Sequence, residues 1–222
     1  DNCKDVMIRK IGDSLTHRID WNFVVVSGRE KLNNTIAMSW DPENGISKDC
    51  WHGYNEALIM YILAAGTNYA NYKEGYAEWL STYKLGEPYT GLKHVLFPPL
   101  FGHQYSHMFV DFRGLYDDYM KDINIDYFEN SRRAAYTQQK YCMENPYGWA
   151  GYDSLTWGIT ACDGPGELYN TDDKKFLWYA GRGSAGKDYN YFDDGTIAPT
   201  AAGGSIPFAP EITIPALYNM FE

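Results

Sequence analysis

Glu56 is the single carboxylate in the stretch from Trp51 to Gly66, WHGYNEALIMYILAAG. Every residue that follows it, up to Ala65, is apolar or aromatic, a pattern typical of a helix inside a protein core. With Gly53 as the N-cap, Glu56 would lie in the first turn. Burial can raise a carboxyl pKa by roughly 3 to 5 units, whereas a helix N-terminus stabilises the anion by only about 0.3 to 1 kcal/mol. Glu56 is therefore a candidate general acid if its site is dry; the alternative is a capping-box-like contact with the Gly53 amide.

Further acidic residues lie in glycine-containing loops: Asp163 in CDGPG, and Asp193 and Asp194 in FDDGT. Glycoside hydrolysis requires two carboxyl groups, one protonated to release the leaving oxygen and one ionised to act as nucleophile or to activate water. Glu56 is a candidate for the acid, and Asp111 or Asp194 for the second group. The alternative for each loop acid is turn formation, because turns favour Asp and Gly.

His103, His107 and Asp111 are spaced by four residues within a helix predicted over residues 101–113, FGHQYSHMFVDFR. One helical face would carry all three, an arrangement that suits metal ligands. The stretch lacks the Glu of the His-Glu-x-x-His pattern, and the sequence offers no second His or Cys cluster to complete the coordination. We therefore expect a polar helix face that bonds a ligand or neighbouring loops, and no metal.

The string GRGSAG, residues 181–186, matches G-x-G-x-x-G and follows a possible strand. A dinucleotide site needs a helix N-terminus after this string to receive the pyrophosphate. Residues 187–194 show no helical period, so we expect neither a bound nucleotide nor any other cofactor.

Composition narrows the class of protein. The 222 residues are 45% hydrophobic, enough for one domain with a sizeable core. A net charge of −10 disfavours nucleic acid and anionic membrane surfaces as partners. Twenty Tyr and seven Trp are more than a core of this size needs, and such amphipathic rings suit hydroxyl-rich ligands such as sugars. No apolar run reaches the roughly 18 residues of a membrane span, and four widely spaced Cys leave the disulfide state open.

Hydrophobic periodicity predicts a mainly α protein with small strands in long loops. The predicted helices cover residues 4–19, 57–65, 72–85, 101–113, 127–144, 200–202 and 209–221. Strands are expected over residues 21–27, pairing with 34–40, and over 176–180. Pro215 should kink or restart the last helix. The loops over 145–166 and 181–195 are long and aromatic, which favours a functional role.

Five sequence blocks resemble, in order, the glycoamylase-like domain of bacterial proteins. They are GYNEALIMYILAAG, PLFGHQYSHMFVDFRG, DYFENSRRA, GWAGYDSLTWGITACDGPG and DDGTIAPTAAGGSIPFAPEITIPAL. That family includes endo-β-1,2-glucanases and is related to the glucan-processing part of cyclic β-1,2-glucan synthases. The resemblance runs from about Trp40 to Leu217 and implies an (α/α)6 barrel with a sugar-binding cleft where the loops gather. About half of the twelve helices of such a barrel are predicted, so residues 1–222 are expected to be a glycoamylase-like catalytic domain that is a portion of a larger barrel.

The resemblance implies that Glu56 is the general acid. The second carboxylate is then Asp111 or Asp194, or it lies outside this chain. The residues expected to contact substrate are Trp40, Trp51, Tyr54, Asn55, His103, Gln104, His107, Arg113, Trp157, Asp163, Arg182 and Asp193.

The function expected from these residues is that of a glycoside hydrolase acting on an oligosaccharide or polysaccharide β-glucan, of the endo-β-1,2-glucanase type. We expect a periplasmic or secreted bacterial protein of undetermined oligomeric state. Two alternatives remain open. One is a glucan-binding module without catalysis, and the other is a polysaccharide lyase with His103, Tyr105 or His107 as base and Arg113 against a uronate.

Overall fold

The computed structural model describes residues 4–27, 32–164, 166, 168–169 and 175–222. The chain forms two compact units. Unit 1 comprises residues 1–53 and 57–83, and unit 2 comprises residues 54–56 and 84–222. Among the described residues, apolar side chains cluster in each unit, and the cluster in unit 2 comprises more residues than the one in unit 1. The expectation of one domain stays a prediction. Cys3 lies outside the described residues.

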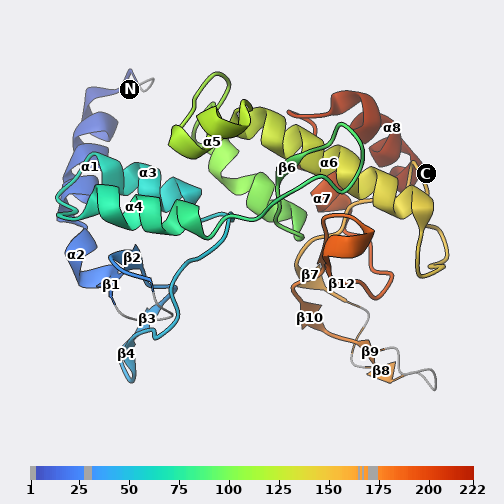
Figure 1. Ribbon diagram of the computed structural model, residues 1–222, viewed down its shortest axis with the longest axis horizontal. Coiled ribbons are helices and arrows are strands. Elements are labelled where there is room, and N and C mark those ends of the chain that lie inside the picture. The colour runs from blue at the N-terminus through green and yellow to red at the C-terminus, as the bar shows by residue number, and fades with distance from the viewer. Residues whose placement is uncertain (1–3, 28–31, 165, 167, 170–174) are drawn as a thin grey trace. The chain divides into compact units, whose positions relative to one another are not determined.

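Unit 1 contains short helices and two antiparallel pairs of very short strands (Figure 1). Val25 is opposite Ile36 in one pair, and Trp40 is opposite Ile46 in the other. The elements of this unit are α1 (Val6–Arg18), α2 (Trp21–Val24), β1 (Val25–Val26), β2 (Thr35–Ile36), β3 (Trp40–Asp41), β4 (Gly45–Ile46), α3 (Leu58–Ala65) and α4 (Tyr72–Ser81). The helices predicted over residues 4–19 and 72–85 are thus confirmed, with shorter bounds.

The strand predicted over residues 21–27 is only partly right. Its first half forms α2, and only β1 is extended, although β1 does pair with β2 as expected. The Asp20 side chain accepts a hydrogen bond from the main-chain N–H of Asn22 at 3.1 Å and so caps α2. This local cap favours a helical turn in residues whose types alone favour a strand.

The helix after Glu56 begins later than predicted. Its first residue is Leu58 and its N-cap position is Ala57, so Glu56 precedes the helix. Gly53 instead adopts a left-handed conformation, with φ of 68°, and donates its N–H to Thr82 Oγ1 at 2.6 Å. The prediction of Gly53 as N-cap is therefore wrong, and with it the capping-box interpretation of Glu56.

One face of α3 is buried within unit 1. Leu58, Tyr61 and Ala64 lie on that face, and the Tyr61 ring stacks on Trp79 of α4 with centroids 4.5 Å apart. Figure 1 shows α3 and α4 side by side. Leu63, on another face, is 46% exposed. The expectation that α3 is enclosed on all sides is therefore wrong for the described residues. Because every residue of this helix is apolar, the sequence did not indicate which face would be buried.

Unit 2 combines helices with short strands in its long loops (Figure 1). Its elements are β5 (Leu85–Gly86), β6 (His94–Val95), η1 (Leu100–His103), η2 (Tyr105–Met108), α5 (Asp118–Ile123), α6 (Tyr127–Glu144), β7 (Cys162–Asp163), β8 (Leu168–Tyr169), β9 (Lys175–Phe176), β10 (Tyr179–Ala180), β11 (Gly183–Ser184), η3 (Lys187–Tyr189), β12 (Asn190–Phe192), α7 (Pro199–Gly203) and α8 (Pro210–Phe221). Neighbouring strands pair antiparallel as β5–β6, β7–β10, β8–β9 and β11–β12. No helix in the described ranges is both long and apolar enough to cross a bilayer.

The core of unit 2 forms between α6, α7 and α8. Helix α6 has the predicted bounds: Asp126 caps its start by accepting a hydrogen bond from the Glu129 N–H at 2.7 Å, and Asn145 ends it in a left-handed conformation. The core contains several alanines, which let helices approach closely: Ala134, Ala135, Ala198, Ala201, Ala202, Ala209 and Ala216. The two C-terminal helices were also predicted, but α8 continues through Pro215 instead of restarting there.

The helix predicted over residues 101–113 is wrong. Two short 3-10 helices, η1 and η2, replace it, and no helix follows until α5, which the sequence did not predict. The N–H of Gln104 bonds the carbonyl of Phe101 at 2.9 Å, and the N–H of His107 bonds that of Gln104 at 3.1 Å, the i to i+3 pattern of a 3-10 helix. His103, His107 and Asp111 therefore do not share one α-helical face.

Candidate active site

Glu56 lies in the turn directly before α3 and belongs with unit 2. Its Oε2 atom is buried and accepts no hydrogen bond from the described residues. Burial raises the pKa of this carboxyl and outweighs the opposing effect of a main-chain hydrogen bond at the same residue. The residue as a whole is only half-buried. A carboxyl that retains its proton to higher pH than usual and is still accessible has the two properties that a general acid needs.

The short segment that carries Glu56 is anchored on unit 2 by a hydrogen bond and by aromatic packing. Ser106 Oγ of η2 donates to the main-chain carbonyl of Glu56 at 3.3 Å. The Tyr54 ring is buried, lies against His103 with centroids 4.9 Å apart, and stacks on Tyr127 of α6 at 5.7 Å. The predicted residue Asn55 is also buried in this segment.

His103 and His107 are held by polar contacts with α6 and the chain before η1. His103 Nε2 donates to the carbonyl of Phe97 at 3.1 Å, and its Nδ1 accepts from the Asn130 amide at 3.3 Å. His107 Nε2 lies 3.0 Å from Ser131 Oγ. Burial lowers the pKa of both imidazoles, to about 4 for His107, so both are neutral at pH 7.

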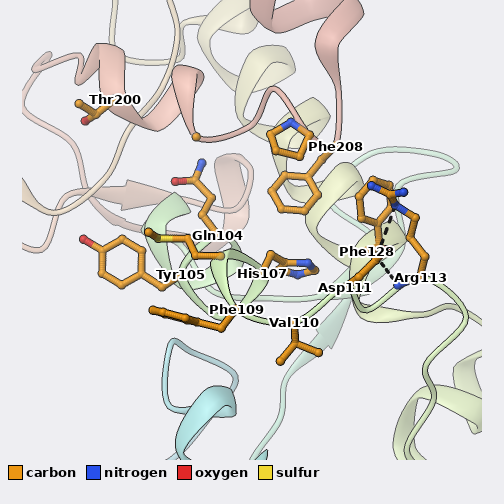
Figure 2. Close-up of a pocket in the computed structure, with 13 residues that line it drawn as sticks. Gln104, Tyr105, His107, Phe109, Val110, Asp111, Arg113, Phe128, Thr200 and Phe208 are labelled. Atoms are coloured by element: carbon orange, nitrogen blue, oxygen red, sulfur yellow. Dashed lines mark hydrogen bonds and ion pairs between the residues drawn. The ribbon is translucent and has the colours of Figure 1, made fainter. Parts of the chain in front are cut away.

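A pocket of about 480 Å³ lies in unit 2 and is lined in part by η2 (Figure 2). Tyr105, Phe109 and Phe208 give it aromatic walls, and Gln104 contributes an amide. The lining residues are Gln104, Tyr105, His107, Met108, Phe109, Val110, Asp111, Arg113, Phe128, Thr200, Gly204, Pro207 and Phe208. Ser106, which bonds the Glu56 carbonyl, lies between two of these residues in the chain. The candidate acid is therefore attached to the same 3-10 segment that forms the pocket.

Asp111 and Arg113 bring opposite charges to the pocket. Arg113 Nε lies 3.5 Å from Asp111 Oδ1, and both side chains are well exposed. The Arg113 guanidinium also covers the Phe128 ring at 4.7 Å from its centroid. Of the two residues predicted as the second carboxylate, Asp111 is thus the accessible one.

The structure gives Asp194 and Arg182 a different role from the predicted one. Arg182 is fully buried, and its Nε and Nη2 donate to the two Asp194 carboxylate oxygens at 2.8 and 2.7 Å. The remaining guanidinium bonds go to the carbonyls of Cys162 and Leu177. Burial alone would raise the pKa of Asp194, but the hydrogen bonds from Arg182 and Thr196 hold it below its usual value. Arg182 is too deeply buried to contact substrate directly, so that prediction is wrong. Asp194 is bound to Arg182 in an ion pair, which disfavours it as the second catalytic carboxylate.

Asp193 and Trp157 also serve the packing of unit 2. Asp193 accepts hydrogen bonds from the hydroxyls of Tyr141 and Tyr152 at 2.8 and 2.7 Å, which tie its loop to α6. Trp157 is completely buried in the core, so the prediction that it stacks on a sugar is wrong. Asp163 is exposed in β7, and its predicted role stays a prediction.

Trp40 and Trp51, the predicted stacking residues of unit 1, differ in exposure. Trp40 in β3 is 53% exposed, whereas Trp51 is half-buried. Their roles in substrate binding stay predictions.

Several site residues were not predicted. Ser106, Phe109, Phe128, Ser131 and Phe208 come from three separate stretches of sequence. Each looks locally like an ordinary helix or loop residue, and no spacing pattern connects them. Their shared location follows only from the tertiary fold.

The remaining motifs are the sequences weighed as metal or nucleotide sites. No three His, Cys, Asp or Glu side chains in this part of the chain are grouped to hold a metal. The G-x-G-x-x-G string contributes Gly183 to β11, where a Cβ atom would come within 2.3 Å of the Pro98 backbone. This glycine therefore allows close backbone packing.

The comparisons with known proteins identify the family. The model of the family Glycoamylase, described as "Putative glucoamylase", matches residues 49–222, well over half of the sequence. The chain belongs to this family. This agrees with the resemblance found in the sequence, including the block around Glu56.

Relatives from Bacteroidetes are similar over the whole chain. A Parabacteroides distasonis protein named exo β-1,2-glucooligosaccharide sophorohydrolase (non-reducing end) is 29% identical over 248 residues, covering 100% of this chain and 31% of that protein. A crystal structure of a "putative glucoamylase" from Bacteroides uniformis is 32% identical with a TM-score of 0.73, covering 100% of this chain and 50% of the other. A β-1,2-glucanase structure from Parabacteroides distasonis is 26% identical with a TM-score of 0.72, covering 99% and 32%. The chain therefore spans half or less of the length of these relatives.

Proposed function

We propose that this chain supplies the general acid and part of the substrate pocket of a glycoside hydrolase that cleaves β-1,2-linked glucan. The observation that carries the proposal is the Glu56 carboxyl, which has a buried oxygen with no hydrogen bond from the described residues and a raised pKa. Its main chain is bonded to the segment that lines an aromatic pocket. The similarity to a sophorohydrolase and a β-1,2-glucanase supports this choice of substrate.

In the proposed mechanism, Glu56 donates its proton to the glycosidic oxygen as the bond to the sugar carbon breaks. A second carboxylate either activates a water molecule or attacks the sugar carbon directly. Asp111 is the candidate of choice in this chain because it lines the pocket and is exposed. A carboxyl separation of about 6.5 to 9.5 Å would specify inversion, and one of about 5 to 5.5 Å would specify retention.

The pocket favours a neutral sugar. Aromatic rings stack on the apolar faces of a pyranose, while Gln104 and Arg113 can bond hydroxyl groups. Arg113 already has Asp111 as its ion-pair partner, and both His103 nitrogens are bonded within the protein, which argues against a lyase acting on a uronate. We further infer that the helices belong to an (α/α)6 barrel, that cleavage is of the endo type, and that the protein acts in the periplasm or outside the cell.

The test is hydrolysis of β-1,2-glucan by the intact protein and by Glu56→Gln. We expect kcat to fall by about 10² to 10⁴-fold, since a positioned general acid contributes about that factor. Glu74→Gln, an exposed glutamate of α4, is the matched control and should retain activity within about twofold. Release of short oligosaccharides throughout the time course would support endo cleavage, whereas sophorose alone would favour exo cleavage.

The rival function is a glucan-binding module without catalysis. Binding of β-1,2-glucooligosaccharides by the wild-type protein without hydrolysis would establish this rival, and unchanged turnover by Glu56→Gln would overturn the role of Glu56.

A further inference from the structure

Ser131 occupies a buried junction that no sequence motif indicated. It lies in the second turn of α6 and is 1% exposed. Its Oγ atom is 2.7 Å from the carbonyl oxygen of His103 and 3.0 Å from His107 Nε2. It also forms a hydrogen bond with the hydroxyl of Tyr54. One hydroxyl group therefore connects α6 with η1, with η2 and with the segment that carries Glu56.

The proton of this hydroxyl goes to a main-chain carbonyl. A serine hydroxyl can donate once and accept twice. The His103 carbonyl can only accept, so Ser131 donates there, at the shortest of the contacts; the Tyr127 carbonyl, 3.0 Å away, is the weaker acceptor of the same proton. The Ser131 oxygen then accepts from His107 Nε2, which carries the proton of the neutral imidazole. Removing the hydroxyl would leave the His103 carbonyl and His107 Nε2 without this partner.

Two connections lead from Ser131 to Glu56. The first runs through Tyr54, two residues before Glu56, whose ring is fixed between His103 and Tyr127. The second runs through Ser106, which lies between His103 and His107 in the chain and donates to the Glu56 carbonyl. Both connections depend on groups that the Ser131 hydroxyl bonds directly.

We propose that Ser131 is a positioning residue for Glu56: its hydroxyl locks the Tyr54–Glu56 segment and the two 3-10 turns together, so that the acid keeps one fixed and dry place beside the pocket. This inference rests on the proposed role of Glu56. Ser131 touches neither substrate nor reacting atoms and acts only through the segment that it holds.

The test compares Ser131→Ala and Tyr54→Phe with the wild-type protein in β-1,2-glucan hydrolysis. We expect either change to make the segment that carries Glu56 more mobile and more accessible to water. We expect kcat to fall about tenfold or more, because small misplacement of a catalytic group is costly, while KM changes by less than about twofold. The alkaline limb of the pH–rate profile, where the acid loses its proton, should move about 0.5 to 1 pH unit lower. Ser131→Thr, which keeps the hydroxyl, should restore the position of that limb.

A matched control lies on the same helix. Thr137 is buried in α6, and its Oγ1 has no hydrogen-bond partner among the described residues. Thr137→Val removes a buried hydroxyl at nearly constant volume and should leave kcat and the alkaline limb unchanged. An effect of Thr137→Val equal to that of Ser131→Ala would reduce Ser131 to a general packing role and overturn the proposal.

A second measurement does not depend on activity. The difference in unfolding free energy between the wild-type protein and Glu56→Gln should vary with pH, because Glu56 titrates differently in the folded and unfolded chain. That variation should shrink when both proteins also carry Ser131→Ala. If Glu56→Gln remains active, the proposed function fails. If Glu56→Gln is inactive but Ser131→Ala and Tyr54→Phe preserve both kcat and the pH dependence of stability, only the role of Ser131 fails.

Discussion

Glu56 and Asp194 are both partly or fully buried carboxyl groups of unit 2, but their surroundings differ. Asp194 faces the Arg182 guanidinium and receives two of its hydrogen bonds, so its charged form is favoured. Glu56 has one oxygen in a buried site without a bonded partner among the described residues, so its neutral form is favoured. Burial by itself would raise the pKa of both carboxyls. The Arg182 guanidinium reverses this effect for Asp194, which therefore holds its loop in place as an anion, whereas Glu56 stays able to donate a proton.

The two groups should therefore link stability to pH with opposite signs. The lowered pKa of Asp194 stabilises the folded protein. This stabilisation is fully present above the ordinary aspartate pKa, about 3.9, and is lost as the pH falls. A raised pKa gives the reverse, because the folded state then binds more protons than the unfolded state and loses stability as pH rises through the folded pKa. Three substitutions test this contrast: one at Asp194, one at Glu56 and one at the exposed Asp111. They follow in order of decreasing expected effect on stability.

Asp194→Asn should cause the largest loss of stability. It leaves the buried Arg182 charge without a counter-charge, and removing one partner of a buried pair costs about 3 to 5 kcal/mol. Urea unfolding at pH 7 measures the loss. It should shrink as the pH falls below about 4, because the unfolded wild-type chain then binds a proton at Asp194 while the folded protein still keeps this carboxyl ionised. Asp118→Asn, which removes an exposed partner of Lys121, is the control and should leave the urea midpoint almost unchanged.

Glu56→Gln should act in the opposite direction. Glutamine carries no charge at any pH, so the variant should be more stable than the wild-type protein at pH 7 to 8 and equal to it near pH 4, where Glu56 is protonated. The measurement is the pH dependence of the unfolding free energy of both proteins. A variant that is less stable at neutral pH would show that the Glu56 carboxylate has a favourable partner, contrary to the contrast with Asp194.

Asp111→Asn should have the smallest effect on stability, within about 0.5 kcal/mol, because its ion pair with Arg113 is exposed. The same variant should lower β-1,2-glucan hydrolysis by at least about 100-fold if Asp111 is the second carboxylate. Urea unfolding and kcat are measured on one preparation. Full activity in Asp111→Asn would show that the second catalytic carboxylate is a residue other than Asp111.

Local sequence signals predicted the long helices well. Helix α6 was predicted to the residue because capping signals surround a clear amphipathic period, and α1, α4 and α8 were located with small errors at their ends. The stretch over residues 101–113 was not, because its aromatic and polar residues fit an α-helix and a 3-10 path equally well. In the 3-10 conformation, His103 and His107 contact residues that are distant in sequence, Ser131 and Phe208 respectively.

For the candidate site, the sequence identified Glu56, Gln104, His107, Asp111 and Arg113, which the structure places on one segment or beside it. It also nominated Trp157 and Arg182, which turn out to be buried. Residue type suggests what a side chain can do, but exposure depends on which other segments cover it.

The sequence by itself determined the family and the long helices, and it led to the prediction of Glu56 as the acid, because these depend on local patterns of residue types. The tertiary structure decided which carboxyl is paired and which is dry, since the cation that meets Asp194 and the hydroxyl that anchors the Glu56 segment come from other parts of the chain. The pKa of a buried acid is set by groups that surround it in space, and no run of neighbouring residues specifies them.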